Sequence, residues 1–302
     1  MKKMKKNLLL VTLLSISFSF AQTTEQDLLK KNEEAIKSLG EERPNGWLKK
    51  GTFTALASQS SFDNWLAGGQ NNFAGNLGLN YDFNYKNDVW TWDNKLIASY
   101  GITKIKGADT QKTDDRLELN SLAGRKAKGY WYYSLFFNFK TQMDVGLDQT
   151  TGVTTSHFFS PAYFQFGPGM LWKKSDNLKV NIAPLTSKLI VVHGHFTEGL
   201  PSTASVFGVE GGETMRYELG AAINGYYKFN LMENVSVENI LNLYSNYLED
   251  PQNVDIDYQL NVAMKINKYL TTNFAFQTIY DDNAFKGFQT RQVLGIGLTY
   301  GF

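Results

Sequence analysis

The sequence contains no cysteine among its 302 residues. Disulfide bonds and thiolate metal sites are therefore excluded. An excess of either charge is also missing, because 30 lysines and arginines nearly balance 29 aspartates and glutamates, for a net charge of +1. Nothing in that balance indicates a basic surface for nucleic acid, so no nucleic-acid partner is expected.

Long apolar runs are absent beyond residue 20. Before that point, the basic stretch 1–6 is followed by the apolar run from Leu8 to Phe20, and the small residues Ser19 and Ala21 stand shortly before Gln22. This order predicts a secretory signal peptide over residues 1–21. A retained anchor helix is the alternative, but the run is shorter than the roughly 20 residues that a membrane span requires.

An exported chain without a transmembrane helix belongs to one of two classes. It is either a soluble periplasmic protein or a transmembrane β-barrel, because only helices and closed barrels satisfy every backbone polar group in lipid. Residues 22–46 are polar, with a few apolar residues at loosely helical spacing. We expect them to form a periplasmic N-terminal extension, either a short amphipathic helix or a mobile tail.

From Gly51 onward the hydrophobic period is two, as in β-strands. The stretches 73–85, 215–229 and 254–266 alternate apolar with polar or small residues. Such runs exceed the usual five or six residues of a globular strand and match tilted membrane strands of about 9–11 residues. The pattern predicts twelve strands, at residues 51–59, 73–85, 89–104, 114–126, 130–143, 161–172, 178–192, 214–229, 235–247, 254–266, 271–281 and 290–302.

The predicted links alternate between tight turns and longer loops. Outer-membrane barrels have short periplasmic turns and long extracellular loops, and an even number of strands makes the two kinds alternate. A β-sandwich does not predict this asymmetry. The fold expected from the sequence is therefore all-β, a single transmembrane antiparallel β-barrel of about twelve strands over residues 47–302, in the bacterial outer membrane.

The last predicted strand is a regular alternation. Its outward face is expected to carry Leu294, Ile296, Leu298, Tyr300 and Phe302, and it resembles the C-terminal insertion signal of bacterial outer-membrane barrels. Its inward face carries Gly295, Gly297 and Gly301. We expect these glycines to leave room in the lumen for a bulky segment, either the N-terminal extension or the loop that contains Trp65.

Several short blocks resemble an outer-membrane family of the Bacteroidota that is known only as a domain of unknown function. The resemblance implies an outer-membrane barrel and supplies no activity. The blocks are Asn64-Trp65-Leu66-Ala67-Gly68-Gly69, Pro184-Leu185-Thr186-Ser187-Lys188-Leu189, Phe207-Gly208-Val209 with Gly211-Gly212, Tyr217-Glu218-Leu219-Gly220-Ala221, Ser245-Asn246-Tyr247, Met264-Lys265-Ile266-Asn267-Lys268-Tyr269-Leu270 and Tyr280-Asp281-Asp282.

Strand parity assigns a balanced set of charges to the lumen, and inward aromatic residues are expected to narrow it. Twelve strands lie between the filled eight-stranded barrels and the open 16–18-stranded porins. The lumen is therefore either a narrow, weakly selective channel or a space filled by an ion-pair network. The predicted charges are Asp82, Asp93, Lys95, Arg116, Glu118, Lys140, Lys179, Arg216, Glu218, Lys228, Glu238, Asp255, Asp257, Lys265 and Arg291, and the aromatic residues are Tyr132, Phe136, Tyr226 and Tyr244.

Loop residues supply a second set of candidates. In loop 60–72, Asn64, Trp65, Gly68 and Gly69 suggest a fixed turn that folds into the barrel mouth as a cap or plug; alternatively Trp65 is an interfacial belt residue. Loop 193–213 is long enough to be functional or disordered. The acidic clusters Asp281-Asp282-Asn283 and Glu249-Asp250 could take Ca²⁺ or bridge lipopolysaccharide phosphates, or they are merely solvated.

An enzyme is the competing class. The three histidines, His157, His193 and His195, lie in or beside predicted outward loops, where an imidazole base could serve Ser156, Ser160 or Ser202 in a lipid hydrolase. His193 and His195 could also form a weak metal site with Glu198. No nucleophile-elbow sequence accompanies them, so exposed loop histidines are the favoured interpretation.

The sequence therefore predicts an integral outer-membrane barrel without catalytic activity, cofactor or bound metal. We expect either a structural subunit of an envelope complex or a narrow solute channel, with a lipid-modifying hydrolase as the alternative. The expected partners are outer-membrane lipids and lipopolysaccharide, the barrel-assembly machinery and, for the structural role, another envelope protein.

Overall fold

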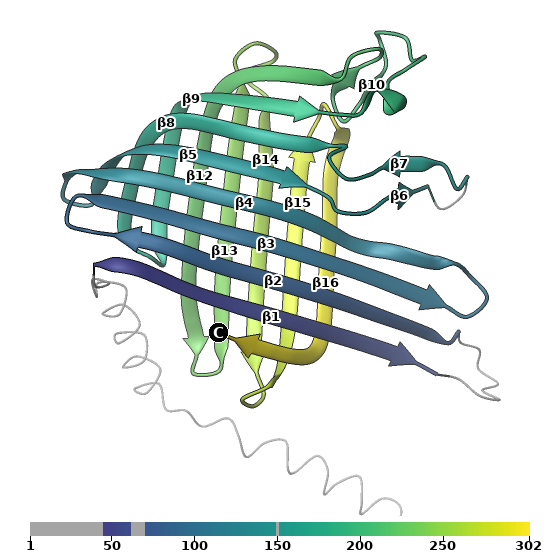
Figure 1. Ribbon diagram of the computed structural model, residues 1–302, viewed down its shortest axis with the longest axis horizontal. Coiled ribbons are helices and arrows are strands. Elements are labelled where there is room, and N and C mark those ends of the chain that lie inside the picture. Colours follow the sequence, from purple (N-terminus) through teal and green to yellow (C-terminus); the bar gives the residue numbers. More distant parts are fainter. Residues whose placement is uncertain (1–44, 62–69, 149–150) are drawn as a thin grey trace, which may run out of the picture. The chain divides into compact units, whose positions relative to one another are not determined.

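Twelve antiparallel strands form a closed barrel in the computed structural model, which describes residues 45–61, 70–148 and 151–302. Around the barrel the strands are ordered β1-β16-β15-β14-β13-β12-β9-β8-β5-β4-β3-β2. Figure 1 shows β1 to β9 in front, crossing β12 to β16 behind. The strands are β1 (Gly46–Ser60), β2 (Asn72–Lys86), β3 (Trp90–Ile105), β4 (Thr110–Lys128), β5 (Trp131–Thr141), β8 (Ala162–Ser175), β9 (Leu178–Val191), β12 (Met215–Met232), β13 (Val235–Asn246), β14 (Val254–Lys265), β15 (Leu270–Asp281) and β16 (Phe285–Gly301).

The predicted fold is confirmed, and each of the twelve predicted strands corresponds to one strand of the barrel. The largest differences are at strand starts: β1 begins at Gly46, β4 at Thr110 and β16 at Phe285. The residues added to β4 are polar, and those added to β1 and β16 mix apolar and polar residues without a period of two, so hydrophobic alternation did not reveal them. They continue the hydrogen-bonded ladder beyond the apolar part of each strand, as in the pairing of Lys112 with Ile102.

Short and long links gather at opposite ends of the barrel, which we call the turn end and the loop end. At the turn end, the links after β2, β4, β8, β12 and β14 contain two to four residues. At the loop end, residues 142–161 contain the small strands β6 (Gly146–Leu147) and β7 (Thr154–Ser156). Residues 192–214 contain the 3-10 helix η1 (Gly194–Phe196) and the strands β10 (Ser205–Val206) and β11 (Val209–Glu210). Two links expected to be long, after β3 and β15, are tight turns at 106–109 and 282–284, because the flanking strands are longer than predicted.

The outer surface of the barrel is apolar because alternate residues of each strand point outward. Tryptophans gather at the turn end, where Trp47, Trp90, Trp92 and Trp131 are exposed. Along β16, Leu294, Ile296, Leu298, Tyr300 and Phe302 are each about half exposed or more. The outward orientation predicted for these five residues is what the structure shows. Within the described ranges, no helix is long and apolar enough to cross a membrane.

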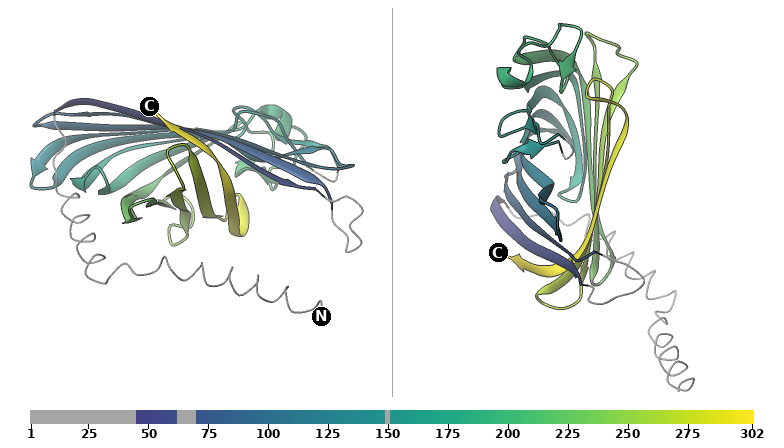
Figure 2. Two further views of the ribbon diagram at one scale, coloured as in Figure 1. Left: turned by 90° about the horizontal axis from the view of Figure 1, so that it is seen from below. Right: turned by 90° about the vertical axis from the view of Figure 1, so that its right-hand side faces the viewer.

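The chain closes on itself where β16 pairs with β1, over Thr52–Ala57 and Ile296–Gly301. Two further hydrogen bonds join Gly51 and Phe302, and Figure 2 shows the C-terminal end of β16 lying against β1. A Cβ atom on Gly297 would lie only 1.9 Å from the Ala55 carbonyl oxygen. The space at Gly295 is bordered by Leu56, at 3.1 Å from the Cβ position. These two glycines therefore allow β1 to approach β16 closely. The expectation that they leave room in the lumen for a bulky segment is wrong for both.

Candidate functional site

The lumen contains a cavity of about 470 Å³, lined by residues from all twelve strands. Its lining extends from Leu48 and Asn177 near the turn end to Ala284 and Gln289 near the loop end. At roughly 30 Å³ per water in the liquid, that volume has room for on the order of 15 water molecules. The interior is thus a narrow space that can be hydrated, not a dry core.

Lys95 and Glu238 join opposite walls of the barrel. Their strands, β3 and β13, are six positions apart in either direction around the barrel, and Lys95 Nζ lies 3.2 Å from Glu238 Oε1. A circular barrel of twelve strands would be roughly 24 Å across, from about 4.8 Å between strands and about 40° of tilt. A Lys–Glu pair can join Cα atoms at most roughly 14 Å apart. The two walls therefore approach closely at this level, and the pair constricts the lumen.

Two more contacts cross the lumen higher up. Arg116 on β4 donates to Gln259 on β14, which is again the opposite strand, over 3.0 Å. Lys140 on β5 lies 3.4 Å from Asp257 on β14. Glu118 accepts hydrogen bonds from Arg116 and from Asn138, which fixes the arginine in position. All these groups are partly or fully buried, so their charges are balanced by one another inside the barrel.

At the turn end, Asp93 is the acceptor between two lysines. Its carboxylate lies 2.8 Å from Lys173 Nζ and 2.7 Å from Lys179 Nζ, and its side chain is only 6% exposed. Lys173 also contacts Asp176 at 2.9 Å. The predicted strands 161–172 and 178–192 leave Lys173 in the link between them, but β8 extends to Ser175 and Lys173 points inward. Strand parity in the sequence assigned Asp93 and Lys179 to the lumen but did not identify Lys173 as the second lysine beside Asp93.

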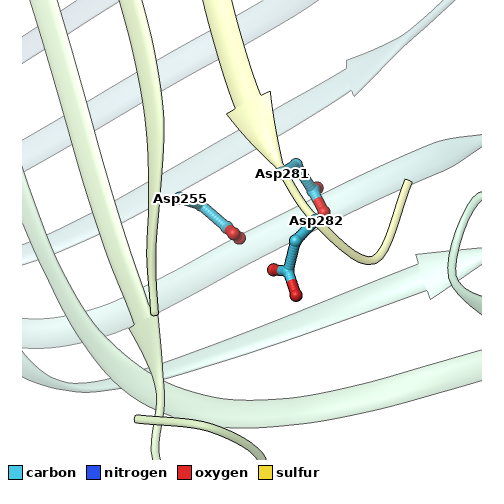
Figure 3. Close-up of side chains that lie close together, drawn as sticks. All are labelled: Asp255, Asp281 and Asp282. Carbon is cyan, nitrogen blue, oxygen red and sulfur yellow. The ribbon is translucent and has the colours of Figure 1, made fainter. Parts of the chain in front are cut away.

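At the loop end, Lys188 lies between three carboxylates. Its Nζ is 3.0 Å from Asp255, 3.2 Å from Glu218 and 3.9 Å from Asp281. Figure 3 shows Asp255 on β14 and Asp281 with Asp282 at the end of β15, whose carboxylates converge within 4.8 Å. Oxygen ligands of this kind suit Ca²⁺. Here, however, the Lys188 ammonium already supplies positive charge to two of the three carboxylates.

Strand parity missed Lys188 for a physical reason. In β9, Lys179, Asn181 and Ala183 point inward at odd positions, whereas Thr186, Lys188 and Ile190 are the inward residues further on. The pairing of β9 shifts against both neighbours between Ala183 and Thr186, next to Pro184. Such a bulge inserts a residue and exchanges the two faces of the strand. Constant parity therefore assigned Lys188 to the outside.

The remaining predicted charges divide into paired and unpaired ones. Arg216 contacts Glu218 at 2.9 Å and Glu249 at 2.6 Å, and Arg291 on β16 pairs with Asp114 on β4. Asp82 lies 3.7 Å from Lys95. Lys228 is the cross-strand neighbour of Glu238, but the described residues include no ion pair for it within 4.0 Å. Lys265 is exposed at the turn end and is likewise not placed in an ion pair.

The loop 192–214 folds over the loop end of the barrel. Its β10–β11 hairpin has Phe207 and Gly208 at the tip, both at positive φ (55° and 84°), and Phe207 lines the lumen cavity. Arg216 donates to the Gly208 carbonyl over 3.1 Å, which fastens the tip to β12. Val209 is fully buried against Ile190 and Val192. We call this hairpin, residues 205–210, the cap.

The cap was not identified from the sequence, which placed a mouth loop at Asn64, Trp65, Gly68 and Gly69. Those residues lie outside the described part of the chain. The length of loop 193–213 was the available signal, since long loops in compact proteins are usually functional or disordered. Which loop folds inward depends on tertiary contacts such as Arg216 with Gly208, and these are not visible in local sequence.

The histidines form no recognisable catalytic pair. His157 Nδ1 lies 2.7 Å from the Phe158 carbonyl oxygen, and the Ser160 hydroxyl accepts from the backbone N–H of His193 at 2.7 Å. The backbone N–H of His195 donates to His193 Nδ1. Across residues 45–61, 70–148 and 151–302, no serine hydroxyl forms a hydrogen bond with a histidine side chain. A nucleophile–base pair requires that contact.

Comparison with known proteins gives a match to one family model over part of the chain. A family model described as "Protein of unknown function (DUF3078)" matches residues 57–147, so similarity to a family of unknown function is confirmed for that part of the chain. No curated protein matches the chain in sequence.

Among solved structures, the chain is similar to three outer-membrane barrels. The first is the translocator domain of the autotransporter NalP from Neisseria meningitidis, with 10% identity, a TM-score of 0.33 and coverage of 92% of this chain and 96% of that chain. The second is an outer membrane channel from Pseudomonas putida F1, with 9% identity, a TM-score of 0.39 and coverage of 87% of this chain and 98% of that chain. The third is the NanC porin, with 8% identity, a TM-score of 0.36 and coverage of 82% of this chain and 98% of that chain. At these scores the likeness is limited to the general barrel architecture.

Proposed function

We propose that the protein is an integral outer-membrane barrel without catalytic activity that acts as a narrow channel for small solutes. The observation that carries the proposal is the lumen cavity, which is lined by all twelve strands from one end to the other and constricted by the Lys95–Glu238 pair. The resemblance of its sequence blocks to a Bacteroidota family of outer-membrane barrels is consistent with a location in the outer membrane.

The outer surface supports a membrane location. Exposed tryptophans at the turn end and exposed Tyr217, Tyr247 and Phe288 near the loop end flank a band of exposed leucine and isoleucine, such as Leu135, Ile182 and Leu294. Aromatic residues prefer both membrane interfaces, and aliphatic side chains prefer the hydrocarbon between them. By analogy with other outer-membrane barrels, the turn end is periplasmic and the loop end faces outward, in contact with lipopolysaccharide.

The lumen chemistry supports a channel of low selectivity. Carboxylates and ammonium or guanidinium groups alternate along its walls and pair with one another, so neither sign of charge dominates the passage. A pore lined by one sign of charge would attract one class of ion. A balanced and constricted pore passes small solutes slowly and excludes large ones.

A structural role in an envelope complex is the second candidate. It is favoured by the cap, whose Phe207 lies in the cavity and whose tip is fastened by Arg216. A barrel that is closed at its mouth and joined across its lumen can serve as a rigid body for a partner protein.

Recording from the refolded full-length protein in planar bilayers distinguishes the two. The channel predicts small, discrete conductance steps, and a reversal potential near zero in a potassium chloride gradient because neither sign of charge dominates the lumen. A membrane that contains correctly folded barrel and shows no steps would contradict the channel and favour the structural role. Folding is checked separately by heat-modifiable gel mobility.

A further inference from the structure

In the half of the lumen nearer the loop end, carboxylates gather on one side. Asp255 and Asp257 are successive inward residues of β14, and both line the cavity. Asp281 on the neighbouring strand β15 lines it as well, and Figure 3 shows that it lies close to Asp255. We call these three residues the acidic wall.

The facing cations come from strands three to six positions away from β14 around the barrel. They are Lys188 on β9, Lys140 on β5 and Arg116 on β4, which line the same cavity and which we call the basic wall. Glu118 also lies on this side, where Arg116 of the same strand neutralises it. This part of the lumen is therefore polarised from wall to wall, with negative charge on one side and positive charge on the other.

The contact between Lys140 and Asp257 is the one that a solute can reach. Their side chains are 30% and 21% exposed, whereas that of Lys188 is 6% exposed. Lys140 Nζ lies 3.4 Å from Asp257 Oδ2, so a solute that fills this part of the cavity has to separate the two groups. Lysine carries its charge on a flexible four-carbon stem, which allows Lys140 to withdraw.

Separating a buried ion pair leaves both charges without compensation, which is costly. An uncharged solute replaces neither partner, and a singly charged one replaces only one. A zwitterion replaces both, with its ammonium against Asp257 and its carboxylate against Lys140, through charge-assisted hydrogen bonds. Potassium and chloride ions that enter together satisfy the two walls separately, so the same lumen also conducts salt.

The cavity also has the size and the apolar surface for a small organic molecule. Its volume of about 470 Å³ falls within the roughly 300–1,000 Å³ of small-molecule sites. Phe136 and Tyr244 pack together and line it, and Tyr244 is the cross-strand neighbour of Asp255. A short aliphatic side chain can therefore contact apolar groups while the charged groups of the same molecule face the two walls.

We propose that the lumen binds small zwitterions, namely α-amino acids with a short apolar side chain, between the acidic and basic walls, and that the channel favours them as solutes. The proposal rests on the channel function and names the substrate class of that channel. Lys140 and Asp257 are the residues that contact the two charged groups of the solute.

Two isomers test the proposal. L-alanine and lactamide contain the same atoms, but only L-alanine is a zwitterion. The refolded full-length protein is placed in liposomes, and the swelling rate in isosmotic L-alanine or lactamide is measured and corrected for protein-free liposomes. We expect L-alanine to enter severalfold faster than lactamide, because only the zwitterion compensates both separated charges. Lactamide entry as fast as that of L-alanine, or faster, would overturn the proposal.

A double variant assigns the preference to the pair. Lys140→Gln with Asp257→Asn removes both charges at nearly constant size, and L-alanine should then enter no faster than lactamide. Lys112→Gln with Asp115→Asn is the matched control, because this pair, 2.7 Å apart at the loop end, is not part of the cavity lining. The control should keep the wild-type preference. A preference for L-alanine that persists in folded Lys140→Gln/Asp257→Asn protein would overturn the assigned site.

Salt conductance separates this proposal from the channel itself. Planar bilayers are formed with the same wild-type preparation in potassium chloride. Discrete steps without a preference for L-alanine in liposomes would overturn the zwitterion site and keep the channel. Absence of both the steps and the protein-dependent swelling would overturn the channel, and the zwitterion site with it.

Discussion

At the residue scale, the interior is organised by charges that share partners. Asp93 accepts from both Lys173 and Lys179, and Lys188 donates to Asp255 beside Glu218. A buried ion pair adds little net stability when it forms, because both ions lose hydration. Removing one partner is costly, because the other charge then remains buried without compensation.

Asp93→Asn is therefore expected to destabilise the barrel. Two ammonium groups that now contact one carboxylate would face a neutral amide, and we expect a loss of about 3 kcal/mol in the free energy of unfolding. The measurement is the urea midpoint of the folded, heat-modifiable form in detergent or liposomes. Asp176→Asn is the control, because Asp176 contacts Lys173 from a half-buried position. A midpoint as high as that of the control would refute the shared-partner account.

Much of this residue-level arrangement was predictable, and its exceptions have physical causes. Parity placed Lys95, Glu238, Arg116 and Asp257 inside, because alternation along a regular strand is a geometric necessity. Parity fails at Lys188, since the bulge near Pro184 exchanges the faces of β9. It also cannot say that Lys95 reaches Glu238 on the opposite wall in addition to its cross-strand neighbour Asp82, because that contact depends on how closely the two walls approach.

At the element scale, strands were predicted well and loops were not. Strand identity follows from local alternation, whereas the cap depends on Val209 packing against Ile190 and on Arg216 holding Gly208. Polar strand ends, such as Thr110 to Lys112, carry no hydrophobic signal although they pair with β3. The described loops that matter for the channel are therefore defined by tertiary contacts.

Phe207→Gly is expected to open the mouth of the lumen. The change removes the ring that lines the cavity and relieves a non-glycine residue at φ 55°, a conformation that costs roughly 1–2 kcal/mol. That relief offsets part of the packing lost against Val192, so the barrel should remain folded. Planar-bilayer recording should show larger conductance steps than wild type. Unchanged steps would mean that the cap does not limit flow.

Gly297→Ala is expected to impair closure of the barrel. Its Cβ would collide with the backbone of Ala55, which cannot move without breaking the short β1–β16 ladder. The fraction of protein that refolds into the heat-modifiable form should fall severalfold. Gly78→Ala is the matched control, since a Cβ on this inward-facing glycine of β2 would make only an ordinary 3.9 Å contact with Thr54. Equal refolding of the two variants would contradict the close-approach role of Gly297.

At the scale of the whole molecule, one property follows from the preceding ones: the two walls are joined across the lumen by side chains of opposite strands. Lys95 with Glu238 and Arg116 with Gln259 each link strands six positions apart in a ring of twelve. Strand number alone suggested an intermediate lumen, between a filled barrel and an open porin. The cross-wall contacts explain why this barrel is constricted well below the width that twelve strands allow.

Single-channel conductance of the Lys95→Ala/Glu238→Ala double variant, compared with wild type, tests this account most directly. Removing both partners takes away one charge of each sign and leaves their neighbours Asp82 and Lys228, which are again of opposite sign, so the barrel should still fold while its constriction widens. We expect small steps from the wild type and distinctly larger steps from the double variant. Steps of equal size in both proteins, or no steps in either, would contradict the central claim that cross-wall ion pairs constrict a conducting lumen.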